Sequence, residues 1–266
     1  MEAVDVGVRA AKLAGQLILQ HATGPLQVRL KGPQDPVTEV DVLAEGLIRR
    51  EIAEAFPDDE VLGEETLKGS RDAERLWVID PLDGTRNYTV GLPFFCVSIA
   101  LTIQRRPVLG VIHDPLRDET FVAARGTGAF VNGRRLHPLA PKSVEQAVVH
   151  VGFLPASNPR NPNLAIPVFL RLRPVIAAMR NLGSAALSLA YVACGRLDVA
   201  LHDGLSPWDM LAAAVILEEA GGIITDFAGL GLSTHSTSVV AAGAQPLHRY
   251  VLDIAQEIIE GTVHTT

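Results

Sequence analysis

The sequence has little cysteine, few aromatic residues and no long apolar run. Its 266 residues include two cysteines, Cys96 and Cys194, and neither lies near a second cysteine or a histidine at the spacing of a zinc site. We therefore expect buried free thiols in a reducing compartment rather than a disulfide framework. The longest uncharged apolar stretch, Met210–Leu217, is far shorter than the roughly 18 residues that span a bilayer, so the sequence predicts no membrane-spanning segment and no membrane partner.

Positive charge is also scarce, since 23 Lys and Arg residues face 30 Asp and Glu residues and the formal net charge is −7. An acidic surface repels the phosphate backbone of nucleic acids, and the chain has no run of Lys and Arg with interleaved aromatic residues. We therefore do not expect nucleic acid as the main partner. If the substrate is itself an anion, the positive charge at the site must come from a metal ion or a helix N-terminus.

What the sequence has in quantity is apolar mass. Hydrophobic residues make up 48% of the chain and charged residues 20%, while the 23 glycines and 17 prolines are scattered. This composition predicts one or two globular domains with a sizeable core and argues against low-complexity disorder. Four charged residues, Glu2, Asp5, Arg9 and Lys12, interrupt the first 20 positions, so we expect a helix of a cytoplasmic protein there and not a signal peptide.

The first part of the chain shows helical periodicity on both sides of one short strand. Apolar residues recur at helical spacing through Val4–Leu19, until Gly24-Pro25 interrupts them. Thr38 can cap a second amphipathic helix that runs to about Phe56. Between the two helices we expect a strand over Leu26–Lys31.

From Leu76 onward the pattern is that of an antiparallel meander, because β-rich segments alternate with turn-prone Asp-Gly, Arg-Arg-Pro and Asp-Pro segments. Asn132-Gly133 then gives a strong hairpin signal. The expected strands are Leu76–Ile79, Cys96–Ile103, Val108–Ile112 and Thr120–Ala123.

Beyond Asn132-Gly133 strands and helices alternate, which is typical of an α/β arrangement. We therefore predict an α/β protein in one compact body, with an α+β subdomain over residues 1–133 and an α/β subdomain over 134–266. The expected strands are Ala147–Val151, Val175–Met179, Leu197–Leu201, 222–225 and Val239–Ala242. The expected helices are 163–172, 185–194, 207–220 and 246–260.

Four acidic residues stand out because each lies at the end of an expected element; they are Glu64, Asp80, Asp83 and Asp209. The strand before Asp80 runs into Asp-Pro-Leu-Asp-Gly-Thr, in which Pro81 fixes a turn and Gly84 permits a tight backbone. Carboxylates that converge in this way repel each other unless a cation lies between them. Oxygen ligands without Cys or His select a hard ion such as Mg²⁺, which also accepts phosphate oxygens as ligands. The residues alone therefore indicate a magnesium and phosphate site.

Each of these motifs also has a purely structural explanation. Asp-Pro and Asp-Gly are common turn formers, and Glu64 continues an acidic loop that would ordinarily face solvent. Ser206 and Asp209 have the spacing of a capping box at the start of a helix, and so have Thr38 and Asp41. Local sequence leaves both explanations open at every one of these positions.

The joint occurrence of the motifs resembles the inositol monophosphatase family. The resemblance is carried by Gly63-Glu64-Glu65, by Asp80-Pro81-Leu82-Asp83-Gly84-Thr85 and by Trp208-Asp209 followed by Glu219-Ala220-Gly221-Gly222. It extends over nearly the whole chain, and the combination of motifs is highly specific. It implies a magnesium-dependent, lithium-sensitive phosphomonoesterase with a layered αβαβα sandwich, which usually works as a homodimer.

The resemblance also implies which residues hold the metal ions. Glu64, Asp80 and the carbonyl group of Leu82 would hold one Mg²⁺, and Asp80, Asp83 and Asp209 would hold a second. Asp80 would bridge the two. A third, weaker ion near Glu64 is a further option that the resemblance leaves open.

Catalytic and substrate-binding roles follow from the same resemblance. Thr85, hydrogen-bonded to Asp41, would orient and help deprotonate the attacking water, with Glu64 as a further participant. Backbone N–H groups of Gly84 and Thr85, at the start of a short helix, would contact the phosphate. The implied substrate-binding residues are Glu64, Leu82, Asp83, Gly84, Thr85, Gly183, Ser184, Ala185, His202 and Asp209.

The resemblance is interrupted at His202. Inositol phosphatases of the family carry a glutamate seven residues before the Trp-Asp aspartate, and that position is His202 here, followed by Asp203. Asp203 could take over the role by a shift of one residue, His202 could contact another hydroxyl or a second phosphate, or His202 could be a structural histidine at the rim. These alternatives leave inositol selectivity open.

We therefore expect a phosphatase that acts on a small phosphorylated polyol or sugar, with inositol 1-phosphate as the leading substrate. The same chemistry would serve a fructose-1,6-bisphosphatase, a 3′-phosphoadenosine 5′-phosphate nucleotidase or a histidinol-phosphate phosphatase, and fold resemblance does not separate them. Pro93–Ser98 resembles the monophosphatase form and disfavours the nucleotidase. The alternative from another class is a non-catalytic interaction protein on the same fold, against which the complete set of acidic residues argues.

Overall fold

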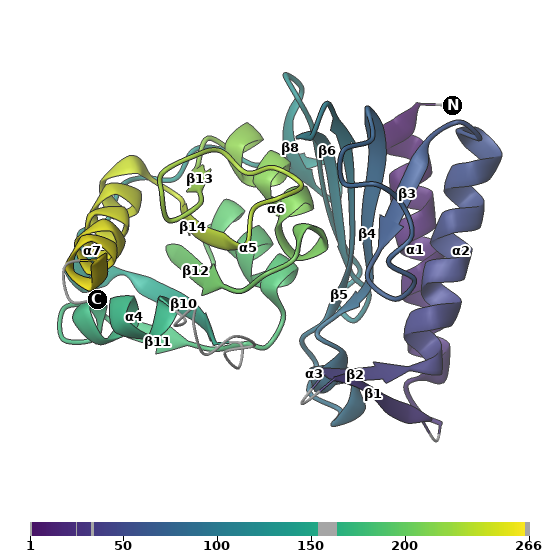
Figure 1. Ribbon diagram of the computed structural model, residues 1–266, viewed down its shortest axis with the longest axis horizontal. Helices are drawn as coiled ribbons and strands as arrows, with labels where there is room; N and C mark the ends of the chain where they lie inside the picture. Colours follow the sequence, from purple (N-terminus) through teal and green to yellow (C-terminus); the bar gives the residue numbers. More distant parts are fainter. Residues whose placement is uncertain (1, 25, 33–34, 154–163, 264–266) are drawn as a thin grey trace.

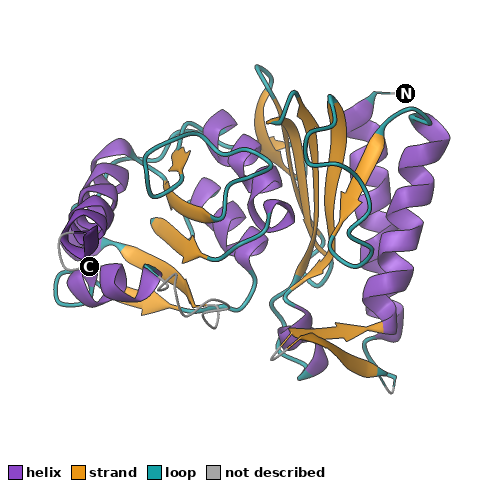
Figure 2. Cartoon of the chain, viewed as in Figure 1, coloured by secondary structure: helices purple, strands orange, loops and turns teal. Residues whose placement is uncertain are grey.

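The computed structural model describes residues 2–24, 26–32, 35–153 and 164–263. Their elements form alternating layers of helix and sheet (Figure 1). Figure 2 shows the two large sheets with helices on both faces of each, and a separate two-stranded hairpin at one end of the larger sheet. This is the αβαβα sandwich expected from the sequence. No helix among the described residues is long and apolar enough to cross a membrane.

The outermost layer on one side consists of α1 (Ala3–His21) and α2 (Glu39–Ala55), which confirms both N-terminal helices. Their buried faces pack on one face of the larger sheet and form a single hydrophobic core with it. Thr38 caps α2 as predicted. The Asp41 carboxylate accepts a hydrogen bond from the Thr38 backbone N–H at 2.8 Å, and the Thr38 hydroxyl accepts from the backbone of the first turn, which completes a capping box.

The larger sheet has seven strands in the order β3-β4-β5-β6-β7-β8-β9. The strands β4 to β9 pair antiparallel in sequence order, which confirms the meander, whereas β3 pairs with β4 in parallel. The strand β3 was not expected, because its acidic neighbours made the segment read as a loop. The bounds are β3 Glu60–Gly63, β4 Arg75–Asp83, β5 Cys96–Ile103, β6 Arg106–Asp114, β7 Glu119–Ala124, β8 Gly128–Val131 and β9 Arg134–Arg135.

The small hairpin pairs β1 (Val28–Gly32) with β2 (Asp35–Thr38). The strand expected over Leu26–Lys31 therefore begins two residues later. The strand β2 was not expected, because Pro36 lacks a backbone N–H and weakens a strand prediction. A single helical turn, α3 (Thr85–Thr89), lies against β2 and supplies the short helix expected after Gly84.

The smaller sheet has five strands in the order β11-β10-β12-β14-β13, of which β10, β11 and β12 are parallel. The expected alternation of strands and helices is confirmed, with ends displaced by up to three residues; residue 163 of the predicted 163–172 helix lies outside the described residues. The strands are β10 Val148–Phe153, β11 Ala178–Arg180, β12 Val199–Asp203, β13 Ile223–Thr225 and β14 Ser238–Ala242. The helices are the 3₁₀ turn η1 Val144–Gln146, α4 Ala165–Leu172, α5 Ala185–Ala193, α6 Pro207–Glu219 and α7 Gln245–Val263.

The two helices α5 and α6 form the layer between the sheets, while α4 and α7 cover the far face of the smaller sheet (Figure 1). The contact between α6 and β6 is backbone to backbone, because a side chain at Gly110 would collide with the carbonyl group of Ala212. The helix α6 thus belongs to the second half of the chain but packs on the sheet of the first half. The division into subdomains at residue 133 stays a prediction.

Candidate metal centre

Two carboxylates of the site come from the end of β4. Asp80 lies opposite Ser98 of β5 and Asp83 lies opposite Cys96, so the two residues between them on β4 face the single residue Val97 of β5. In a regular strand Asp80 and Asp83 would point to opposite faces, because the side-chain period is two. The extra residue is a bulge that includes Pro81, and it turns both carboxylates to the same side.

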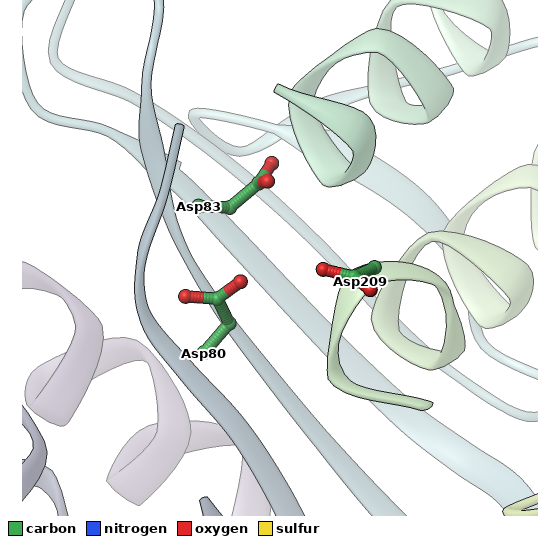
Figure 3. A group of neighbouring side chains, drawn as sticks. All are labelled: Asp80, Asp83 and Asp209. Carbon is green, nitrogen blue, oxygen red and sulfur yellow. The ribbon is translucent and has the colours of Figure 1, made fainter. Parts of the chain in front are cut away.

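The third carboxylate comes from the first turn of α6, in the layer next to the larger sheet. Asp209 accepts a hydrogen bond from the Ser206 backbone N–H at 2.6 Å, so the capping box predicted there is present. One ligand oxygen each from Asp80, Asp83 and Asp209 lie within 4.8 Å of one another. Figure 3 shows Asp80 and Asp83 at the end of β4 beside Asp209 at the start of α6. The structural and the functional explanation of Asp209 are therefore compatible.

The electrostatics of this cluster favour a cation. Burial raises the pKa of Asp80 well above its ordinary value, and the nearby Glu64 and Asp83 carboxylates raise it further. Asp209 shows the same direction for the same reasons, with burial first and Glu64 next. Among the described residues, the only hydrogen-bond donor to the Asp80 carboxylate is the Leu82 backbone N–H, at 3.0 Å. A hard divalent cation would neutralise this set of oxygen ligands, so the residues fit Mg²⁺.

Glu64 lies near the cluster but points to a lysine. It follows β3, and its carboxylate accepts a hydrogen bond from Lys31 Nζ of the hairpin at 2.6 Å. Lys31 also reaches Glu65 at 3.0 Å. Burial, followed by the charge of Glu64, raises the pKa of Glu65 to about 7. The Glu64-Glu65 pair is thus not an ordinary solvated surface, and Lys31 is a site neighbour that sequence reasoning missed.

The predicted pair of Thr85 and Asp41 is also present. The Thr85 hydroxyl lies 2.9 Å from Asp41 Oδ1 and 2.9 Å from the Leu82 carbonyl oxygen, either of which it can donate to. Burial raises the pKa of Asp41, although hydrogen bonds from Thr38 and Thr85 act in the opposite direction. The structure therefore connects α2, β4 and α3 at one point beside the acidic cluster.

The predicted segment Gly183–Ala185 lies at the start of α5 and meets Asp83. The Asp83 carboxylate accepts hydrogen bonds from the Ala186 and Ala185 backbone N–H groups, at 2.8 and 3.2 Å, and from the Ser184 hydroxyl. Gly183 has φ +79°, and a side chain there would approach the Asn87 amide to 2.7 Å, which explains the glycine. The segment is thus held to the larger sheet through Asp83.

His202 is buried and packs on another histidine. Its ring lies 4.7 Å from that of His150 on the neighbouring strand β10, and His202 Nε2 has no hydrogen-bond partner among the described residues. Burial and the neighbouring His150 lower the pKa of His202 well below its ordinary value. Neither histidine belongs to the cluster of three aspartates. The partner His150 was not predicted, because a lone histidine within a strand carries no signal of its own.

A second element that sequence reasoning missed is the support behind Glu64. Glu45, buried on α2, accepts hydrogen bonds from the Glu65 backbone N–H at 2.8 Å and from the Thr66 hydroxyl at 2.6 Å. Arg49 donates to Glu45 at 2.8 Å and to the Val61 carbonyl oxygen at 2.8 Å. The spacing of four residues between Glu45 and Arg49 was the available signal, although it is typical of any exposed helix face.

The layered fold and three carboxylates gathered between a sheet and a helix layer support a metal-dependent phosphatase. The chain belongs to the inositol monophosphatase family, whose model matches residues 1–260. Members of this family generally use Mg²⁺, in agreement with the oxygen-only ligands of the cluster.

Named relatives and solved structures cover most of the chain. The Nus factor SuhB of Pseudomonas aeruginosa is 43% identical over 233 residues, which cover 85% of this chain and 86% of that protein. The Nus factor SuhB of Escherichia coli strain K12 is 40% identical over 244 residues, covering 90% of each. An IMPase of Thermotoga maritima superposes with a TM-score of 0.87 at 34% identity, covering 98% of this chain and 99% of that chain. The extragenic suppressor protein suhB of Bartonella henselae gives 0.87 at 37% identity, covering 94% and 97%.

Proposed function

We propose that the protein is a Mg²⁺-dependent phosphomonoesterase of small polyol or sugar phosphates, with inositol 1-phosphate as the leading substrate. The observation that carries this proposal is the convergence of Asp80, Asp83 and Asp209 on one buried point, with the Thr85 hydroxyl and Asp41 beside it. This arrangement supplies a place for a cation, a place for a phosphate and a polar group for water.

We assign the metal ligands as follows. Asp80, Asp83 and Asp209 would hold one Mg²⁺, Asp80, Glu64 and the Leu82 carbonyl oxygen would hold another, and a third ion would join Glu64. When bound, the ions acidify water and offset the negative charge of the phosphate and of the leaving oxygen. For Glu64 to act as a ligand, its carboxylate must share or release Lys31, with which it is now paired.

Thr85 and Asp41 are the residues that we assign to the attacking water. The single hydroxyl proton of Thr85 is directed to Asp41 or to the Leu82 carbonyl oxygen, so the lone pairs of its oxygen can accept a hydrogen bond from water. As the water attacks phosphorus, its proton can pass to Thr85 Oγ1 while the Thr85 proton passes to Asp41. Burial raises the pKa of Asp41, which makes this carboxylate a better proton acceptor than an exposed one.

The phosphate and the polyol are assigned to adjoining segments. Backbone N–H groups of Gly84 and Thr85 contact the phosphate; because α3 is a single turn, these contacts depend on the two N–H groups rather than on a long helix dipole. Gly183–Ala185 and His202 form the polyol side. His202 lies one residue before the end of β12, which leads through residues 204–208 to Asp209.

The comparisons support the substrate class more than a single compound. An IMPase-II described as bound to inositol monophosphate is 26% identical with a TM-score of 0.81, and an IMPase-II described as bound to 2′AMP is 26% identical with a TM-score of 0.77. Both compounds are phosphate monoesters of a hydroxylated ring. Fructose 1,6-bisphosphate, 3′-phosphoadenosine 5′-phosphate and histidinol phosphate are the competing substrates.

The test is phosphate release from these three compounds and from inositol 1-phosphate, each with Mg²⁺ and with a chelator. We expect Mg²⁺-dependent release, and a preference of two or more orders of magnitude in kcat/KM, which corresponds to about 3 kcal/mol of transition-state binding, would identify the substrate. Comparable slow release from all four compounds would support the phosphatase reaction but would not identify the substrate. No Mg²⁺-dependent release from any of them would refute the proposal.

A second candidate function is that of a binding factor for other proteins. It rests on the relatives named Nus factor SuhB, because this name refers to a factor and mentions no enzymatic activity. The two functions are compatible on one fold. Chelator-insensitive capture of a partner by an inactive Asp80→Asn variant would favour the second function, whereas absence of a partner in the presence of full phosphatase activity would exclude it.

We further propose a cytoplasmic homodimer whose activity Li⁺ inhibits, in line with the family resemblance. Sedimentation velocity at micromolar concentration tests the dimer. Phosphate release at increasing Li⁺ concentration and fixed Mg²⁺ concentration tests the inhibition. If both ions compete for the same carboxylates, the inhibition should weaken as the Mg²⁺ concentration is raised.

A further inference from the structure

The helix α5 begins without the usual cap from its own serine. Ser184 occupies the N-cap position, where a serine oxygen ordinarily accepts a hydrogen bond from the first turn. Its side chain makes no such bond. Instead, the Asp83 carboxylate of β4, about 100 residues earlier in the chain, accepts from the Ala185 and Ala186 backbone N–H groups of that turn. A carboxylate from the larger sheet therefore takes the place of the missing cap.

The hydroxyl of Ser184 is consequently available for another partner, and that partner is again Asp83. Ser184 Oγ donates a short hydrogen bond to Asp83 Oδ2. From the opposite strand, the thiol of Cys96 lies 3.6 Å from the same oxygen and donates to it. Both side chains are buried, Ser184 with 1% and Cys96 with 0% of its surface exposed. Figure 3 shows the Asp83 carboxylate turned towards the start of α5.

The two oxygens of Asp83 are thereby made unequal. A carboxylate offers about four lone-pair sites. Among the described residues, the hydrogen bonds to Oδ2 come from Ser184, Cys96 and the Ala186 N–H at 2.8 Å, whereas the one to Oδ1 comes from the Ala185 N–H, at 3.2 Å. Oδ1 is thus the oxygen with a lone pair left for a cation, and Oδ2 is the oxygen by which the side chain is fixed.

We infer that Ser184 and Cys96 are positioning residues that hold Asp83 as a one-point ligand through Oδ1. The Ser184 hydroxyl then acts on the substrate through the metal site, and the polyol side proposed for Gly183–Ala185 is left to the other groups of that segment. Because Asp83 holds the first turn of α5 at the same time, the orientation of this ligand and the position of Gly183–Ala185 are set by one group of hydrogen bonds. This inference rests on the proposed cation site.

The experiment compares Ser184→Ala with Ser188→Ala in the full-length protein. Ser188 lies one turn later in α5, is equally buried, and donates to the Ser184 carbonyl oxygen without contacting Asp83. Mg²⁺ affinity is measured by calorimetry on protein freed of metal, in the absence of substrate. We expect Ser184→Ala to bind Mg²⁺ about 10- to 100-fold more weakly, as is typical for loss of a group that orients a ligand, and Ser188→Ala to bind within about twofold of the unaltered protein.

Two further variants keep the inference testable if Ser184→Ala does not fold. Ser184→Thr retains the hydroxyl and should retain most of the Mg²⁺ affinity, while Cys96→Ala removes the weaker donor and should lower the affinity by a smaller factor. Equal affinity in Ser184→Ala and the unaltered protein, with an increased KM for substrate, would overturn the inference in favour of direct substrate contact. Failure of the unaltered protein to bind Mg²⁺ would instead refute the proposed cation site itself.

Discussion

Replacement of Asp80 by asparagine should have opposite effects on the stability of the metal-free protein and on its activity. Two unit charges 4.8 Å apart interact by about 3 kcal/mol at an effective dielectric constant of 20, and Asp80 faces two such neighbours in Asp83 and Asp209. Raised pKa values relieve part of this repulsion through proton uptake. We therefore expect Asp80→Asn to raise the free energy of unfolding by about 1–3 kcal/mol at pH 7.5 in chelator.

The sign of the pH dependence follows from the same shift. The pKa of Asp80 is higher in the folded than in the unfolded protein, so the folded state binds more protons once the pH exceeds about 4. The contribution of this group to stability is therefore lost as the pH rises through its folded pKa. Asparagine does not titrate, and Asp80→Asn should flatten this part of the stability curve.

The assay is urea unfolding in chelator and in excess Mg²⁺, followed by phosphate release. In Mg²⁺ the order should reverse, because the unaltered protein gains binding energy that the variant has lost, and turnover should fall more than about a hundredfold. Asp58→Asn, an exposed acid outside the cluster, controls for the change in net charge. A variant that is less stable than the unaltered protein in chelator, or that retains near-normal turnover, would refute this reasoning.

Three further perturbations test other parts of the structure. Burial lowers the pKa of His150 to about 4, so the contribution of this group to stability is present above pH 6.5 and falls by about 3 kcal/mol as the pH falls towards 4. His150→Phe should remove this loss, which urea titrations at several pH values would measure. An unchanged pH profile of the variant would contradict the prediction. Gly63→Ala would bring a methyl group to 2.5 Å from the Glu45 carboxyl carbon. We therefore expect the free energy of unfolding, measured by thermal unfolding, to fall by about 1–3 kcal/mol and Mg²⁺ binding to weaken. Unchanged stability would show that Glu45 is free to move. Thr85→Ala should lower kcat with little change in Mg²⁺ affinity, while Thr89→Ala, in the same helical turn, should leave both unchanged; equal kinetics of the two variants would exclude Thr85 from catalysis.

The sequence was sufficient for the layered fold because its helices and core strands carry strong periodic patterns. The N-caps of α2 and α6, Thr38 and Ser206, were predictable from capping-box spacing alone. The strands β2 and β3 were not, because pairing with a neighbouring strand outweighed the unfavourable Pro36 and the acidic residues around Glu60. Local propensity is a weak guide where the partner strand lies elsewhere in the chain.

The site was predictable in its members but not in their arrangement. The resemblance named Asp80, Asp83 and Asp209, which the structure brings together. The bulge at Pro81 that turns two of these carboxylates to one side depends on register with β5, which has no local signal. Lys31 beside Glu64 and Cys96 beside Asp83 are contacts across 33 and 13 positions of sequence, and no local pattern marks either pair.

Asp41 and Asp209 each have a role in the proposed site and a role in capping a helix, and this combination determines how an inactive variant should be made. Each carboxylate also caps the helix that carries it, by accepting the N–H of Thr38 or of Ser206. Alanine at either position would remove a cap worth about 1 kcal/mol together with the charge, so a loss of turnover would be confounded by fraying of α2 or α6. Asparagine keeps an oxygen in the capping position. Replacement of either aspartate by asparagine should therefore give an inactive but correctly folded variant. Such a variant is needed to separate the enzymatic role of the protein from a scaffolding role in a cell.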